Sequence, residues 1–223
     1  MDTVSESKPS TKKVILLHGL GRASLSMAYL ANRLQRAGYS PVNISYPSRK
    51  YPIKKLAADF VLPAIEERTK SSEPVHFVTH SLGGIIARQL AASQAPITFG
   101  RVVMLAPPNG GSEIANIVER NIFVGAFNGP AGKELGTSEN DLPHSLGPTL
   151  FEVGIIAGNR TINPLLSRKI EGENDGRLSV KNAKLEGMAD FIVLPVSHPL
   201  IMLSKKVAEE TFHFLEFGKF QRK

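Results

Sequence analysis

Six short apolar runs that alternate with helical stretches constrain the fold of this chain more than any other feature. The runs are residues 14–17, 42–45, 75–79, 102–105, 151–157 and 191–196. Most of them are apolar on both faces, which is typical of parallel strands buried between two layers of helices. Apolar residues recur at helical spacing in residues 25–37, 53–69, 82–93 and 203–217. The alternation predicts an α/β fold with a mostly parallel central sheet of about six strands and helices on both faces.

The chain of 223 residues is expected to form one domain over residues 13–217. Residues 1–12 are polar and aperiodic and predict a disordered N-terminal tail, and residues 218–223 form a basic C-terminal tail. Residues 107–149 are rich in Gly, Pro, Asn and Ser, with at most one helix near 113–121. A long irregular segment after a strand is usually functional, so we expect it to form a cap or rim over a site.

A serine stands where the third predicted strand meets a helix. Residues 79–83 read Thr-His-Ser-Leu-Gly, which resembles the Gly-x-Ser-x-Gly pattern of a nucleophile elbow. Gly83 is the small residue that the pattern requires two positions after Ser81, whereas Thr79 replaces the usual glycine two positions before it. The alternative interpretation is an ordinary helix N-cap serine. The position at a strand end favours the nucleophile.

A serine nucleophile needs an imidazole, which comes last in the chain order serine, acid, histidine that accompanies a nucleophile elbow. His198 follows the last predicted strand and precedes the final helix, so it lies at the same sheet edge as Ser81. The remaining histidines favour structural roles: His18, His76, His80, His144 and His213.

The imidazole needs a carboxylate that fixes its tautomer. Asp175, in the sequence Asn-Asp-Gly, lies between the fifth predicted strand and the histidine strand, and it is the predicted acid. Asp-Gly is also a common turn dipeptide. Glu173 and Asp190 are the alternatives, and Asp190 is the weaker because it begins a strand at the opposite edge.

An oxyanion requires two backbone N–H donors. Leu82, at the start of the helix after the serine, is expected to supply one. The first strand ends in a His-Gly-Leu-Gly loop, in which Leu20 is expected to supply the other. Gly19 and Gly21 permit the turn, and His18 is expected to shape the loop by hydrogen bonding without transferring protons.

Together, the His-Gly-Leu-Gly loop, the His-Ser-Leu-Gly-Gly elbow, the Asn-Asp-Gly turn and the Ser-His before the last helix resemble the α/β-hydrolase superfamily. The likeness extends over residues 13–217 and includes the stretch 106–112, Ala-Pro-Pro-Asn-Gly-Gly-Ser. Within the superfamily the chain resembles small lipases and esterases, including hydrolases of the GPI-inositol deacylase type. The resemblance implies a serine hydrolase with Ser81, Asp175 and His198 as its triad.

Hydrolysis of carboxylic esters or lipids is therefore the leading functional hypothesis, with no cofactor and no metal expected. Acyl transfer or thioester cleavage by the same triad is an alternative, and a non-catalytic binding protein with this fold is another. Several apolar residues of the expected rim suit either an acyl chain or the core: Ile114, Ile117, Ile122, Phe123, Phe127 and Leu200.

The charge and the absence of cysteine narrow the remaining possibilities. The net charge is +7, but the basic residues are scattered and lack interleaved aromatics, so we expect no nucleic-acid partner and at most weak association with an anionic membrane surface. A basic peripheral membrane binder without turnover is a third hypothesis. Without cysteine, disulfides and thiolate chemistry are excluded. No signal peptide or apolar run of membrane-spanning length is visible, so a cytoplasmic location is expected.

Overall fold

One parallel sheet of six strands, in the order β2-β1-β3-β4-β5-β6, organises the molecule. The structure is a computed structural model that describes residues 12–69, 73–115 and 129–222. The strands are β1 (Lys13–Leu17), β2 (Ser40–Ile44), β3 (Val75–His80), β4 (Phe99–Leu105), β5 (Val153–Gly158) and β6 (Asp190–Leu194). Every neighbouring pair is parallel. The predicted α/β fold is confirmed.

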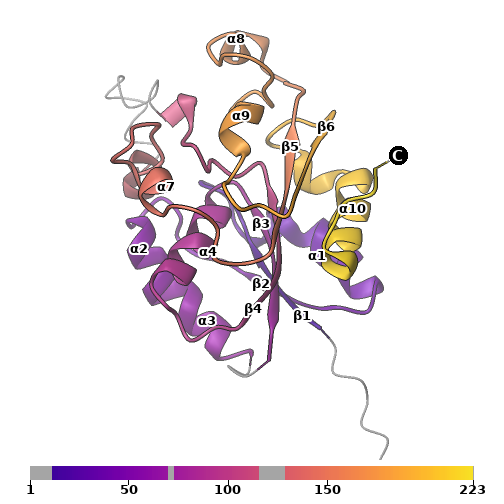
Figure 1. The fold of residues 1–223 in the computed structure, drawn as a ribbon. Helices are drawn as coiled ribbons and strands as arrows, with labels where there is room; N and C mark the ends of the chain where they lie inside the picture. The colour runs from indigo at the N-terminus through magenta and orange to yellow at the C-terminus, as the bar shows by residue number, and fades with distance from the viewer. Residues whose placement is uncertain (1–11, 70–72, 116–128, 223) are drawn as a thin grey trace, which may run out of the picture.

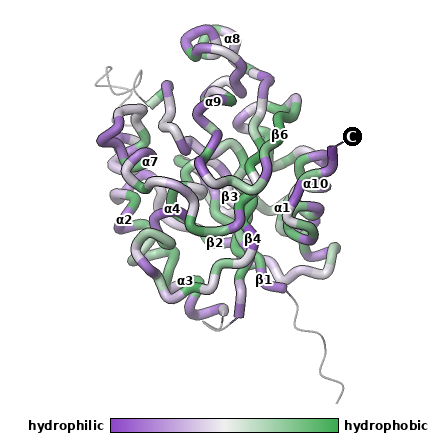
Figure 2. The backbone as a smooth tube through the Cα atoms, in the orientation of Figure 1, coloured by the Kyte–Doolittle hydropathy of each residue, from purple (hydrophilic) through white to green (hydrophobic). Residues whose placement is uncertain are grey.

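Helices cover both faces of this sheet (Figure 1). On one side lie α1 (Ala28–Arg36), which follows the short helix η1 (Ser24–Met27), and α10 (Lys205–Phe217), which follows η3 (Ile201–Leu203). On the other side lie α2 (Ile53–Lys55), η2 (Leu56–Val61), α3 (Leu62–Glu66) and α4 (Leu82–Ala92). Of the remaining short helices, α8 (Pro164–Ser167) lies above the upper end of the sheet in this view and α9 (Val180–Ala183) lies below α8, beside β5, while α7 (Leu142–Ser145) lies on the side of α2 and α4. Hydrophobic residues concentrate along the central strands (Figure 2).

The predicted helix 53–69 differs from a regular α-helix. Residues Leu56–Val61 form a π-helical turn between α2 and α3, and Pro63 is the second residue of α3. Proline has no N–H for a carbonyl one turn earlier, and its ring clashes with that carbonyl in a regular helix. The wider π turn before Pro63 accommodates the ring within one continuous helical run.

The ends of the chain pack against the domain where the structure describes them. Of the expected tail 1–12, only Lys12 lies within the described residues, and it forms an ion pair with Glu216. Near the C-terminus, Phe220 is buried against Phe214, and Arg222 pairs with Asp190. No helix in the described part of the chain is long and apolar enough to span a bilayer.

Arg88 of α4 fixes part of the segment expected to form a rim. Its buried guanidinium donates to the carbonyl oxygens of Pro143 and Gly147, at 2.8 and 2.7 Å, and to Asn109 Oδ1 at 3.2 Å. Burial lowers the pKa of Arg88 to about 10. The guanidinium of Arg88 therefore binds polar groups of the rim segment and holds that segment against α4, the helix that follows Ser81. Residues 116–128 of the expected rim lie outside the described residues.

The strand order places β1 and β3 side by side, where the direction in which strands are added to the sheet reverses. From β1 the chain first moves outward to β2 and later returns to add β3 on the other side of β1. Open α/β sheets bind ligands beside such a reversal, at the carboxyl ends of the strands. The loop after β1 contains Leu20, and Ser81 follows β3 directly.

Candidate active site

Ser81 lies in a strained turn between β3 and α4. Its backbone has φ 53° and ψ −119°, a conformation that L-residues with a side chain rarely adopt. The N–H of Ser81 donates to the carbonyl oxygen of Leu105 in β4, at 2.9 Å, so the neighbouring strand holds the turn in place. An ordinary helix N-cap serine has an extended backbone and bonds to its own helix. Ser81 makes no such side-chain bond, which rules out that interpretation.

Glycines let the elements around Ser81 approach closely. A Cβ at Gly83 would lie 2.6 Å from the carbonyl oxygen of Leu17, so α4 contacts the end of β1 where only glycine fits. A Cβ at Gly84 would lie 3.4 Å from Thr79 Oγ1. The threonine that departs from the motif thus lies beside the second glycine after the serine.

Ser81, His198 and Asp175 form one continuous chain of side-chain contacts. His198 Nε2 lies 3.2 Å from Ser81 Oγ, and His198 Nδ1 lies 2.7 Å from Asp175 Oδ2. Asp175 is buried, and its other oxygen accepts from the backbone N–H groups of Arg177 at 3.0 Å and Leu178 at 2.8 Å. These bonds fix the carboxylate in the orientation that meets the imidazole.

The long stretch between β5 and Asp175 returns to the end of β5. A Cβ on Gly158, the last residue of β5, would lie 3.0 Å from Asp175 Cβ. The backbone N–H of His198 donates to the Asp175 carbonyl oxygen at 3.0 Å, so the two loops are tied by their main chains as well. The alternative acids bond elsewhere: Glu173 accepts from Asn159, and Asp190 accepts from residues of the C-terminal end.

The loop after β1 is shaped by His18. Its Nε2 accepts from the backbone N–H of Tyr46 at 3.2 Å, which leaves Nδ1 to donate to the Gly19 carbonyl oxygen at 2.9 Å. The ring is buried and stacks on Tyr46, and burial lowers the pKa of His18. His18 is therefore neutral, with both nitrogens occupied, as expected of a structural histidine. Gly21 adopts a positive φ of 68°, and its N–H donates to Ser48 Oγ.

The two backbone groups expected to bind an oxyanion are unengaged. Within the described residues, neither the Leu20 N–H nor the Leu82 N–H donates a hydrogen bond. A Cβ at Gly19 would lie 3.2 Å from Ser81 Cβ, so the loop that carries Leu20 directly abuts the serine.

A cleft of about 520 Å³ opens above these residues. Ser81 and His198 lie on its wall with Leu20 and Ile114. Leu200, also expected near an acyl chain, is 48% exposed and lines a neighbouring cavity instead. The other apolar candidates, Ile117, Ile122, Phe123 and Phe127, lie outside the described residues.

His80 also takes part in the site, which the sequence pattern did not reveal. Its Nε2 lies 3.1 Å from the carbonyl oxygen of His198, and because a carbonyl only accepts, Nε2 carries the proton. His80 is buried, and burial followed by the nearby His198 lowers its pKa well below the ordinary value. A neutral second imidazole therefore lies directly behind the first. Arg22, Arg49 and Arg177, likewise unassigned from sequence, also line the cleft.

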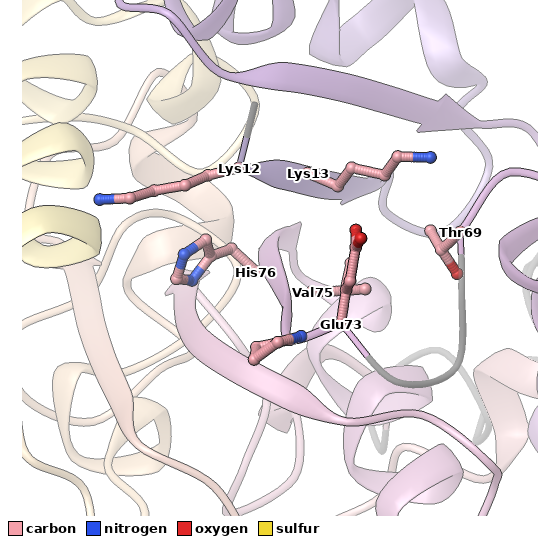
Figure 3. A pocket seen from close by; sticks show the side chains of 7 residues that line it. Lys12, Lys13, Thr69, Glu73, Val75 and His76 are labelled. Carbon is pink, nitrogen blue, oxygen red and sulfur yellow. The ribbon is translucent and has the colours of Figure 1, made fainter. Parts of the chain in front are cut away.

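Another cavity, of about 290 Å³, lies at the opposite edge of the sheet, where β1 and β3 begin (Figure 3). The side chains of Lys12 and Lys13 extend in opposite directions there. Lys12 pairs with Glu216, and Lys13 donates to the carbonyl oxygen of Arg68. Both charges are thus engaged, and the cavity is remote from Ser81. Within the described ranges, no cluster of three His, Asp or Glu residues could hold a metal ion.

This chain was compared with protein-family models, curated proteins and solved structures. The model of the alpha/beta hydrolase family matches residues 14–197. Comparison with curated proteins gives no match. Among solved structures, the mature form of Bacillus licheniformis lipase BlEst2 has a TM-score of 0.70 and 22% identity, over 97% of this chain and 96% of the lipase. Its propeptide form has a TM-score of 0.74 and 20% identity, over 100% of this chain and 53% of that one.

A further similar structure is the phospholipase PlaB from Legionella pneumophila. Its TM-score is 0.67 and its identity 19%, over 92% of this chain and 57% of that chain. This chain thus spans only about half the length of PlaB and of the propeptide form of BlEst2. At these identities the likeness establishes the fold.

Proposed function

Because the chain belongs to the alpha/beta hydrolase family, we propose that it is a serine hydrolase that cleaves carboxylic esters. The observation that carries this proposal is the unbroken series of contacts from Ser81 Oγ through His198 to Asp175. The similar structures are described as a lipase and a phospholipase, which agrees with an ester bond as the target.

In the proposed reaction His198 Nε2 removes the Ser81 proton as Oγ attacks the carbonyl carbon of the ester. Asp175 holds Nδ1–H toward itself and stabilises the imidazolium that forms. His198 then donates the proton to the departing alcohol, which leaves Ser81 acylated. Water, deprotonated by His198, hydrolyses this acyl-enzyme and restores the serine.

The N–H groups of Leu20 and Leu82 are proposed to bind the oxyanion of both tetrahedral intermediates. Neither N–H has another acceptor among the described residues, and the Gly19 loop contacts Ser81, which supports this assignment. Removal of one such donor typically costs about 3 kcal/mol of transition-state stabilisation. The strained backbone of Ser81 supports the same role, because strain of this kind concentrates at functional sites.

The test is covalent labelling with an alkyl fluorophosphonate, followed by intact-mass analysis and location of the modified peptide. We expect one adduct, on Ser81. It should be absent from Ser81→Ala and form at least about 100-fold more slowly in His198→Ala, because the oxygen then lacks its base. Ser112→Ala is the matched control, since Ser112 lines the same cleft but its hydroxyl donates to the Arg177 carbonyl oxygen.

Turnover of short para-nitrophenyl esters should be lost in the same variants. A folded wild-type protein that neither labels nor turns over esters would overturn the proposal and favour a non-catalytic binding protein. Labelling of Ser81 without ester hydrolysis would point to another acyl acceptor or to a thioester substrate.

A further inference from the structure

Three guanidinium groups line the cleft around Ser81. They belong to Arg22, Arg49 and Arg177, while no Asp or Glu side chain is among the described residues of the cleft wall. The three come from separate segments, after β1, after β2 and beside Asp175. The wall of the cleft therefore carries positive charge from several sides of the serine.

None of these three arginines has a carboxylate partner within the described residues. Some arginines elsewhere do: Arg68 pairs with Glu67, Arg101 with Glu152 at 3.1 Å, and Arg222 with Asp190. The Asp175 carboxylate next to the cleft is already occupied by His198 and two backbone N–H groups. Asp175 offsets part of the positive charge beside Arg177, but none of the three guanidinium groups is held in an ion pair in the part of the chain that the structure describes.

Arg22 and Arg49 lie next to the segments that carry His198 and Leu20. Arg22 is half-buried, and its Nη2 donates to the carbonyl oxygen of Pro199, the residue after His198, at 3.1 Å. Burial and then the charge of Arg177 lower the pKa of Arg22, so two like charges interact across the cleft. On the other side, a Cβ at Gly21 would lie 2.4 Å from Arg49 Nη2, which places this guanidinium against the oxyanion loop.

We propose that the cleft selects esters that carry a second, anionic group, a carboxylate or a phosphate, on the acyl or the alcohol part. This inference rests on the proposed ester hydrolysis and defines its substrate class. Arginine suits the role because its planar guanidinium donates two parallel hydrogen bonds to carboxylate or phosphate oxygens. An anion in the cleft would also relieve the repulsion between Arg22 and Arg177.

The chemistry at Ser81 is unchanged by this selection. The Oγ–carbon bond forms, the bond from the carbonyl carbon to the alcohol oxygen breaks, and the alcohol leaves with the proton from His198. Water then releases an acid that bears the anionic group when that group is on the acyl part. The arginines bind the anionic group and position the ester, and they transfer no proton.

Two pairs of soluble esters that differ in one charge test the proposal. The acyl pair is mono-para-nitrophenyl glutarate and para-nitrophenyl methyl glutarate, and the alcohol pair is para-acetoxybenzoate and its methyl ester. We expect the anionic member of at least one pair to have the higher kcat/KM, by about tenfold. The preference should shrink between about 0.05 and 0.5 M NaCl because salt screens the charges.

Arginine variants connect this preference to the cleft. Arg177→Gln and Arg49→Gln change exposed side chains and should preserve the fold. Each should lower the ratio of anionic to neutral kcat/KM by about three- to tenfold. Arg36→Gln is the matched control, because it removes the same charge from the end of α1, at the opposite edge of the sheet from Ser81, and should leave the ratio unchanged.

A binding measurement on Ser81→Ala needs no turnover and separates this inference from the proposed function. Calorimetry should detect glutarate or inorganic phosphate binding, weakened about tenfold by adding Arg177→Gln. If neutral esters are hydrolysed without any preference for the anionic members, the hydrolase proposal holds but the anionic selection is overturned. Ser81→Ala protein that binds neither glutarate nor phosphate would also overturn the anionic selection. Anion binding without labelling of Ser81 would support the charged cleft and contradict the hydrolase.

Discussion

At the scale of single residues, His80 is the feature of the site that calls for a functional explanation. Its Nε2–H is bonded to the carbonyl oxygen of His198, and a Cβ at Gly19 would lie only 2.8 Å from its Nδ1. His80 therefore links the Gly19–Leu20 loop to the backbone of the proposed base. Because it stays neutral, it adds no charge opposite His198 when that ring takes a proton.

His80 is accordingly expected to be a positioning residue. His80→Leu should lower kcat by about tenfold with little change in KM, because the His198 backbone loses its donor while the substrate cleft keeps its charge. His80→Gln retains an N–H donor and should recover most of kcat. Steady-state kinetics on one neutral ester decides this, with circular dichroism as the check on folding. Equal loss in both variants would contradict the role of the donor.

At the scale of elements, the close contact of α4 with β1 sets the position of Ser81. Gly83→Ala would place a methyl group 2.6 Å from the Leu17 carbonyl oxygen, a backbone atom that cannot move independently of the sheet. We expect this change to lower the free energy of unfolding by about 3 kcal/mol. Urea denaturation measures the loss, and the rate of fluorophosphonate labelling reports whether Ser81 has moved.

Gly84→Ala is the matched control in the same helix turn. Its methyl group would lie 3.1 Å from Pro107 Cβ and 3.3 Å from the flexible Met104 side chain. Small shifts can relieve these contacts, and alanine favours a helix over glycine by about 1 kcal/mol, so the net change should be within about 1 kcal/mol. Equal destabilisation by the two substitutions would show that the Leu17 contact does not set the geometry.

The alternation of strands and helices could be predicted because buried parallel strands and amphipathic helices have distinct apolar periods. The placement of Ser81 and His198 followed from the same reasoning, since parallel strands end at one edge. The π turn before Pro63 was missed because apolar spacing does not report the width of a helical turn. The charged cleft was missed for a different reason: Arg22, Arg49 and Arg177 are far apart in the chain and meet only after folding.

At the scale of the whole molecule, three histidines link folding stability to pH. Burial lowers the pKa of His80, of His18 and of His76. Below an unfolded pKa of about 6.5 the unfolded chain binds protons at these positions that the folded protein does not. Stability must therefore fall as the pH decreases through this value. Glu216, whose pKa is lowered by its hydrogen bond to Lys12, acts in the same direction only below about pH 4.5.

The window between pH 7.5 and 5.5 thus isolates the histidines. His80, fully buried, should account for about 1.4 kcal/mol of lost unfolding free energy over this range, and the more accessible His18 and His76 should add smaller amounts. Urea denaturation of the wild type at the two pH values measures the total. His80→Gln cannot titrate there, so its loss should be smaller by about 1.4 kcal/mol. If the stability of the wild type stays flat or rises on acidification, these imidazoles become protonated in the folded state. The assignment of His80 as a neutral ring behind His198 would then be wrong.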